Sequence, residues 1–126
     1  MRSLRVLFTL LGGFLGFMLG GADAFLYTLI AFVAIDYISG VLVAICEKKV
    51  SSKVGARGIS KKIMLFALVA VANLIDCNLT NTSVLRTATI FFYLSNELIS
   101  ILENADKLGL PVPEKLRNIL EQFKKK

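Results

Sequence analysis

The sequence lacks histidine and tryptophan altogether and contains only two cysteines and two prolines among its 126 residues. Histidine is the most frequent general base and metal ligand in proteins, so its absence disfavours catalytic triads and metal centres. Two cysteines are too few for a disulfide-stabilised secreted module. We therefore expect no enzymatic activity and no cofactor.

Charged residues are also scarce. They make up 19% of the chain, against about 25% in ordinary soluble domains. Hydrophobic residues reach 56%, and the mean hydropathy is +0.70. This composition disfavours a disordered chain, which needs low hydrophobicity, and it favours a membrane protein.

Four apolar segments have lengths near the roughly 20 helical residues that cross a bilayer. They cover residues 6–21, 25–46, 63–79 and 85–102. Spanning segments without period-two alternation must be helices, because only a helix satisfies its own backbone in hydrocarbon. We therefore predict an all-α integral membrane protein. Residues 1–105 form its domain of four transmembrane helices, with a loop at 47–62.

The basic residues predict the orientation of these helices, since short cytoplasmic loops are rich in Lys and Arg. Two precede the first helix, six lie in the central loop and six follow the fourth helix; only Arg86 lies on the other side. Both termini are therefore expected in the cytoplasm of a bacterial cell, at its plasma membrane. The basic residues expected against anionic lipid headgroups are Lys48, Lys49, Lys53, Arg57, Lys61, Lys62, Lys124, Lys125 and Lys126. No aromatic platform accompanies them, so a nucleic-acid partner is not expected.

The first segment allows two interpretations. Arg2 and Arg5 before an apolar run, with Ala22-Asp23-Ala24 after it, match a cleavable secretory signal, and cleavage would leave three transmembrane helices. Small residues spaced for close helix contact favour a retained packing helix instead. The glycines predicted to pack helices together are Gly12, Gly16, Gly20 and Gly40.

Polar side chains inside the apolar segments are candidates for an oligomer contact or a pore lining. They are Asp36, Asn73, Asp76, Asn96 and Glu97. Each carboxyl group opposes insertion unless it faces other helices, water or another polar group.

Arg86 is predicted to lie at the depth of Asp76 and to pair with it. Asp36 and Glu97 are predicted to have no basic residue at their depth, so one or both would be protonated or would share a proton. The alternative is that these groups only join the helices of one subunit.

Residues 106–126 are predicted to form a basic cytoplasmic tail. Pro113 suits the first turn of a helix. Apolar residues then follow at i, i+3, i+4 and i+7, namely Leu116, Ile119, Leu120 and Phe123. Such an amphipathic helix is too short to span and is expected in the membrane interface, with Lys124 to Lys126 on the headgroups. A partner-binding helix would have the same pattern.

Several short motifs of the chain occur in the same order and spacing in a known family. They are DYISGV (36–41), SSK (51–53), GISKK (58–62), NLID (73–76), NELISILEN (96–104) and LGLPVPEKL (108–116). On these motifs, residues 25–120 resemble the small holins of the toxin-secretion and phage-lysis family, which include clostridial toxin-export holins. The first 24 residues are the least similar part.

The resemblance implies a phage- or prophage-encoded membrane protein that oligomerises and opens lesions at a set time. Such lesions would release an endolysin or a large toxin, without a necessary direct contact between the two proteins. The alternative function is a small oligomeric transporter or ion channel, which would share the helices and carboxyl groups.

Overall fold

In the computed structural model, which describes residues 1–124, all regular secondary structure is helical. The elements are α1 (Arg2–Met18), α2 (Ala24–Cys46), α3 (Ser52–Ile75), a π-helical turn η1 (Asp76–Thr80), α4 (Val84–Lys107) and α5 (Glu114–Lys124). Within α5, the side chains of Leu120, Phe123 and Lys124 lie outside the described ones. The prediction of an all-α fold with a short C-terminal helix is confirmed.

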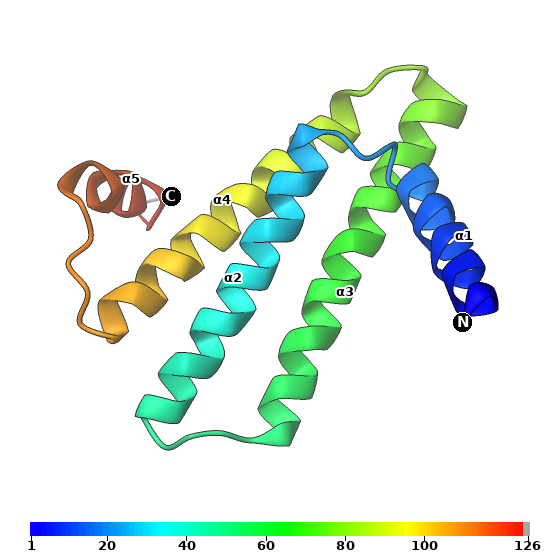
Figure 1. The fold of residues 1–126 in the computed structure, drawn as a ribbon. Helices are drawn as coiled ribbons and strands as arrows, with labels where there is room; N and C mark the ends of the chain where they lie inside the picture. The colour runs from blue at the N-terminus through cyan, green and yellow to red at the C-terminus, as the bar shows by residue number, and fades with distance from the viewer. Residues whose placement is uncertain (125–126) are drawn as a thin grey trace.

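Helices α1 to α4 run alternately up and down (Figure 1). The N-terminus, the 47–51 connection and the end of α4 therefore lie at one end of the bundle, and the 19–23 and 81–83 connections lie at the other. Helix α2 packs most extensively on α4, which also packs on α3, while α1 touches α3 over a small area. Helix α5 lies beside α4, where Arg117 is 3.7 Å from Asp106.

Local signals set the helix ends. The carboxylate of Asp23 accepts a hydrogen bond from the backbone N–H of Leu26 and so caps the start of α2. Ser51 caps α3 in the same way. Helix α1 ends in a Schellman turn, in which Gly20 has a φ of +91° and the N–H of Gly21 donates to the carbonyl of Gly16.

The predicted 47–62 loop is too long. The connection covers only residues 47–51, because the Ser51 cap starts α3 before the apolar run begins. Four basic residues assigned to the loop therefore lie on the first three turns of α3; they are Lys53, Arg57, Lys61 and Lys62. Helix α4 likewise extends five residues beyond the predicted end at 102.

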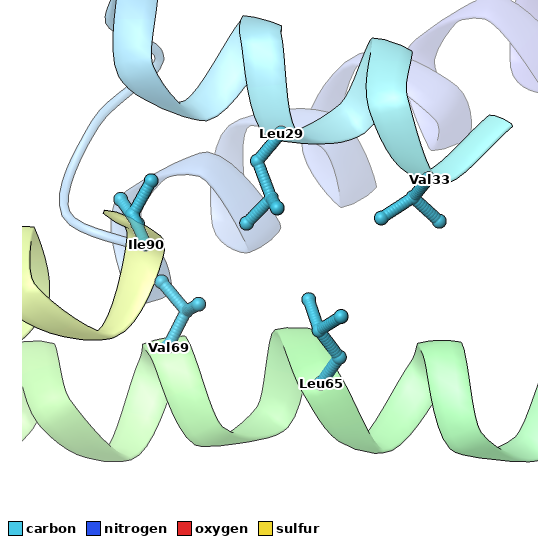
Figure 2. Close-up of a cluster of buried hydrophobic side chains, with 5 residues drawn as sticks. All are labelled: Leu29, Val33, Leu65, Val69 and Ile90. Atoms are coloured by element: carbon cyan, nitrogen blue, oxygen red, sulfur yellow. The ribbon is translucent and has the colours of Figure 1, made fainter. Parts of the chain in front are cut away.

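The apolar core is small. Leu29 and Val33 of α2 meet Leu65 and Val69 of α3 and Ile90 of α4 (Figure 2). Helix α1 buries no residue at all, and many large apolar side chains elsewhere are exposed. A surface of this kind needs lipid or other protein to cover it.

Within residues 1–124, two helical segments are long and apolar enough to cross a membrane. They are Ala24–Cys46, which is α2, and Ser52–Thr80, which is α3 with η1. At about 1.5 Å per residue, the second would be roughly 43 Å long, which exceeds the roughly 30 Å of the hydrocarbon layer. A segment of that length leaves room for the basic start of α3 outside the hydrocarbon layer.

Candidate functional site

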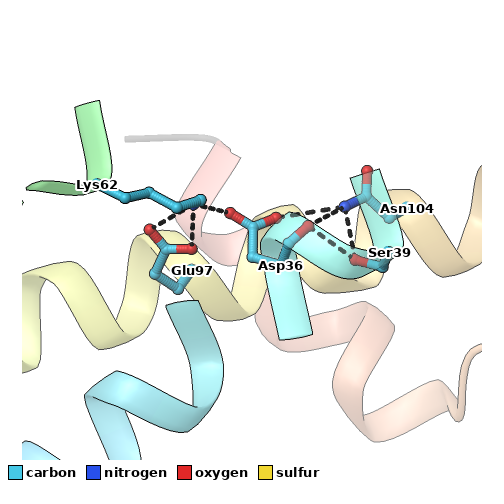
Figure 3. Close-up of polar contacts among 5 residues, drawn as sticks. All are labelled: Asp36, Ser39, Lys62, Glu97 and Asn104. Carbon is cyan, nitrogen blue, oxygen red and sulfur yellow. Dashed lines mark hydrogen bonds and ion pairs between the residues drawn. The ribbon is translucent and has the colours of Figure 1, made fainter. Parts of the chain in front are cut away.

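Three charged side chains from three helices meet in the middle of the bundle (Figure 3). The ammonium of Lys62 on α3 lies 2.6 Å from Oδ2 of Asp36 on α2 and 3.0 Å from Oε2 of Glu97 on α4. The Lys62, Asp36 and Glu97 side chains are 19%, 10% and 8% exposed, respectively. We call Asp36, Lys62 and Glu97 the ionic triad. With all members ionised, it carries a net charge of −1.

Two further polar residues hold Asp36 in place. The amide of Asn104 on α4 donates to the Asp36 carboxylate at 3.3 Å, to the Asp36 backbone carbonyl at 3.3 Å and to the Ser39 hydroxyl at 2.9 Å. Ser39 in turn donates to the carbonyl of Asp36. A Cβ added to Gly40 would lie 3.8 Å from the same Asn104 amide, so this glycine sits at the α2–α4 contact. These bonds fix Asp36 from the side opposite Lys62.

The prediction that no basic residue lies at the depth of Asp36 and Glu97 is wrong. Lys62 is that residue. The prediction misses it because it assigns residues 47–62 to a loop outside the membrane. A signal in the sequence could have found it. Lys62 stands three residues before Leu65 and seven before Val69, which places it on the buried face of α3 by helical periodicity.

Clefts reach the ionic triad from two sides. A cleft of about 740 Å³ runs between α2 and α3 from the 47–51 connection and is lined by Asp36, Lys62 and Asn104 at its inner end. A smaller one, of about 360 Å³, lies between α3 and α4 and is lined by Lys62, Glu97 and Asn96. The predicted site residue Asn96 is exposed and faces this second cleft.

A second polar cluster closes the opposite end of the bundle. The guanidinium of Arg86 on α4 is buried and donates to both carboxylate oxygens of Asp23, at 2.8 and 3.2 Å. It also donates to the backbone carbonyls of Leu19 and Gly21, at 2.5 and 3.0 Å. Asn73 on α3 donates to the carbonyl of Met18 at 3.0 Å. These bonds tie the end of α1 and the start of α2 to α3 and α4.

The predicted pairing of the Arg86 side chain with Asp76 is therefore wrong. The Asp76 carboxylate accepts hydrogen bonds from the backbone N–H groups of Leu85 and Arg86, at 3.2 and 2.8 Å, and thereby caps α4 across the 81–83 connection. The guanidinium is left to bind Asp23. Its hydrogen bonds to that carboxylate hold the pKa of Asp23 below the usual value of 3.8.

The predicted glycine ridge makes little contact within the chain. A Cβ added to Gly12 or Gly16 would meet nothing within 4 Å. Gly20 lies beyond the end of α1, and a Cβ there would clash with Arg86 and Asn73. Gly12 and Gly16 instead line an apolar cleft of about 720 Å³ between α1, α2 and α3.

The basic residues predicted to face headgroups lie on the 47–51 connection, on the first three turns of α3 and at the C-terminal end of the chain. Among the described side chains, five of these basic residues are exposed; they are Lys48, Lys49, Lys53, Arg57 and Lys61. The exception is Lys62, which belongs to the ionic triad. Lys125 and Lys126 lie outside the described residues, as does the side chain of Lys124. Within residues 1–124, no group of three Cys, Asp or Glu side chains could hold a metal ion.

Comparison with known proteins identifies a family. Residues 13–125 match the bacteriophage holin family. An uncharacterized protein of Listeria monocytogenes is 46% identical over 112 residues, which cover 89% of this chain and 80% of that protein. An uncharacterized 14.9 kDa protein of Clostridium perfringens is 41% identical, over 92% of this chain and 89% of its own. A Bacillus subtilis protein, also uncharacterized, is 33% identical over 88% of this chain and 83% of its own. No solved structure matches.

Proposed function

The chain belongs to the bacteriophage holin family, and we propose that it acts as a holin, without enzymatic activity. It would accumulate in the bacterial plasma membrane, oligomerise and open lesions through which an endolysin or a toxin leaves the cell for host lysis. The released protein would pass through the lesion without direct contact being required. The observation that carries the proposal is the combination of this family with charged side chains held inside a bundle whose exterior is apolar.

The charge distribution supports an orientation with both termini in the cytoplasm. The N-terminus, the 47–51 connection and the end of α4 share one end of the bundle (Figure 1), and the exposed basic residues gather there. Cytoplasmic loops are enriched in Lys and Arg, which anionic headgroups attract at about 1 kcal/mol per residue. Anionic lipids are therefore proposed partners of this end.

The exposed surface of α1 supports self-association. Helix α1 buries no residue, and space is open beside Gly12 and Gly16. Small residues let membrane helices approach closely. The double variant Gly12→Leu, Gly16→Leu should therefore weaken chemical cross-linking between copies in membranes. The control variant Leu10→Phe adds bulk at an exposed position on the far side of the same helix, and its cross-linking should persist. An unchanged cross-linking pattern in the double variant would count against α1 as the subunit contact.

The decisive experiment expresses the chain in bacteria with and without a cytoplasmic cell-wall hydrolase. If the chain is a holin, culture density falls abruptly after a delay only when both proteins are present, and the chain alone stops growth. A transporter or ion channel would instead permit growth and show saturable transport. Continued exponential growth with both proteins present would overturn the proposal.

A matched pair of variants controls for toxicity of overexpression. Val33→Asp places another carboxyl group in the core of α2, three residues from Asp36, at a cost of about 2.5 to 3.5 kcal/mol for insertion. This variant should not lyse cells. Val33→Ala keeps the position apolar and should retain lysis.

A further inference from the structure

The ionic triad raises a question of solvation. It holds one ammonium against two carboxyl groups, with Asp36 at the middle of α2. A net charge buried in a dry apolar interior is very costly, and charged residues inside membrane proteins face water-filled cavities or partners that neutralise them. When both carboxyl groups are ionised, the ammonium neutralises only one of them.

The larger cleft has room for water beside the triad. It has a volume of about 740 Å³, which is room for many water molecules. Half of its lining residues are polar; they are Asp36, Tyr37, Lys49, Ser51, Ser52, Lys62, Ser100 and Asn104. Lys49 and Ser51 belong to the connection at the mouth of the cleft, whereas Asp36 and Lys62 line its inner end.

The cleft does not continue to the other end of the bundle. Beyond the ionic triad, the centre is filled by the apolar cluster of Figure 2, in which Leu29, Val69 and Ile90 are fully buried. Above that cluster, the bonds of Arg86 to Asp23 and to the 19–21 carbonyls close the end of the bundle.

We propose that this cleft is a water-filled half-channel, which leads from the 47–51 end of the bundle to the ionic triad and stops there. It is a site for water and small hydrated ions within a single chain, and it exists before any lesion opens. The half-channel does not depend on the proposed lysis function, because a transporter or ion channel would need the same access.

Thiol labelling tests this directly. In a background with Cys46→Ser and Cys77→Ser, we place single cysteines at three positions. Ser100→Cys lies at the inner end of the cleft and Ala44→Cys nearer its mouth. Ile38→Cys is the control, since Ile38 lies on α2 close to the level of Asp36 but is 59% exposed on the outer surface. Each full-length variant is treated with a membrane-impermeant methanethiosulfonate, in inside-out and right-side-out vesicles prepared before any fall in culture density.

A fourth variant, Glu47→Cys, identifies which vesicle side the 47–51 end faces. From that side, Ser100→Cys and Ala44→Cys should react about tenfold or more faster than Ile38→Cys, because thiolate forms in water and not in lipid. From the other side, all three should be slow. If Ser100→Cys disturbs folding, Ala44→Cys still decides between water and lipid.

Three results would overturn the half-channel. Equal, slow reaction of the cleft positions and Ile38→Cys would mean that lipid fills the cleft. Fast reaction of Ser100→Cys from both sides would mean a continuous pore. Fast reaction only from the side opposite Glu47→Cys would mean that access comes from the other end. Failure of the lysis experiment would leave these measurements unaffected.

Discussion

Arg86 and Asp23 form a bidentate ion pair across 63 residues of sequence, and this pair joins α4 to the turn between α1 and α2. The side chain of Arg86 is 8% exposed and that of Asp23 is 44% exposed. Arg86 also binds two backbone carbonyls of the turn. One guanidinium thus donates hydrogen bonds both to the carbonyls that follow α1 and to the carboxylate of the residue that caps α2.

Replacing this arginine should loosen the attachment of α1. Arg86→Met leaves the turn carbonyls of Leu19 and Gly21 without this donor, and we expect a loss of about 2 kcal/mol in the free energy of unfolding. Denaturant titration of the protein in mild detergent micelles measures the change. Arg57→Met is the matched control, because Arg57 is exposed on α3, and it should change stability by less than about 0.5 kcal/mol. Equal effects of the two variants would contradict the proposed role of Arg86.

The same pair predicts a pH dependence. Because Arg86 holds the pKa of Asp23 below its usual value of 3.8 in the folded chain, the ionised carboxylate contributes stability above that pH. This contribution is lost as pH falls from the unfolded pKa through the lower folded pKa. The difference in unfolding free energy between the natural chain and Asp23→Asn should thus be constant near neutral pH and shrink below about pH 4.

Denaturant titrations of both chains between about pH 6 and about pH 3 test this dependence. Asp106→Asn is the comparison, since Asp106 is an exposed residue with a distant arginine partner at 3.7 Å. Its difference from the natural chain should be small at every pH. If the difference for Asp23→Asn grows as pH falls, Arg86 does not stabilise the ionised carboxylate of the folded chain.

Two glycines of the predicted ridge should respond in opposite ways to alanine. Gly20 has a φ of +91°, and a Cβ there would clash with the Arg86 side chain. Gly20→Ala should therefore cost about 1 to 3 kcal/mol. Gly12 lies inside α1 with open space around it, so Gly12→Ala should be neutral or stabilise by up to about 1 kcal/mol. Thermal unfolding in detergent compares the two, and equal destabilisation would show that Gly12 packs within the chain.

Hydropathy predicts the helices well where their apolar part is long. Helix α2 begins and ends within one residue of the predicted 25–46. Hydropathy fails at α3, because a helix starts at its capping residue, here Ser51, and not where its side chains become apolar. The first ten residues of α3 are mostly polar or small, so hydropathy alone assigns them to a loop.

That error hides the centre of the candidate site. Asp36 and Glu97 can be recognised from the sequence because a carboxyl group stands out in an apolar run. Lys62 does not stand out, since it directly follows the exposed Lys61 and precedes the apolar run. The partner of Arg86 could not be predicted from the sequence either. Similar depth in the membrane does not show how far a guanidinium reaches. Nor does it show that backbone N–H groups already donate to the Asp76 carboxylate.

Variants of the ionic triad should show whether its three charges stabilise the fold only in combination. Lys62→Met removes the ammonium of the triad and leaves the carboxylates of Asp36 and Glu97 facing each other inside the bundle. Removing one partner from a buried ion pair costs about 3 to 5 kcal/mol, whereas replacing every charged member by a neutral group of similar size is close to neutral. The triple variant Asp36→Asn, Lys62→Met, Glu97→Gln should therefore regain most of the stability that Lys62→Met loses.

Unfolding of these variants by added dodecyl sulfate, followed by circular dichroism in mild micelles, measures the effect. Lys61→Met is the matched control, because Lys61 is the exposed neighbour of Lys62 on the same helix. Its stability should match that of the natural chain. If Lys62→Met is as stable as Lys61→Met, the ammonium does not hold the carboxylates together, and water in the cleft alone must solvate them. If the triple variant is as unstable as Lys62→Met, packing of the lysine stem rather than its charge joins the three helices.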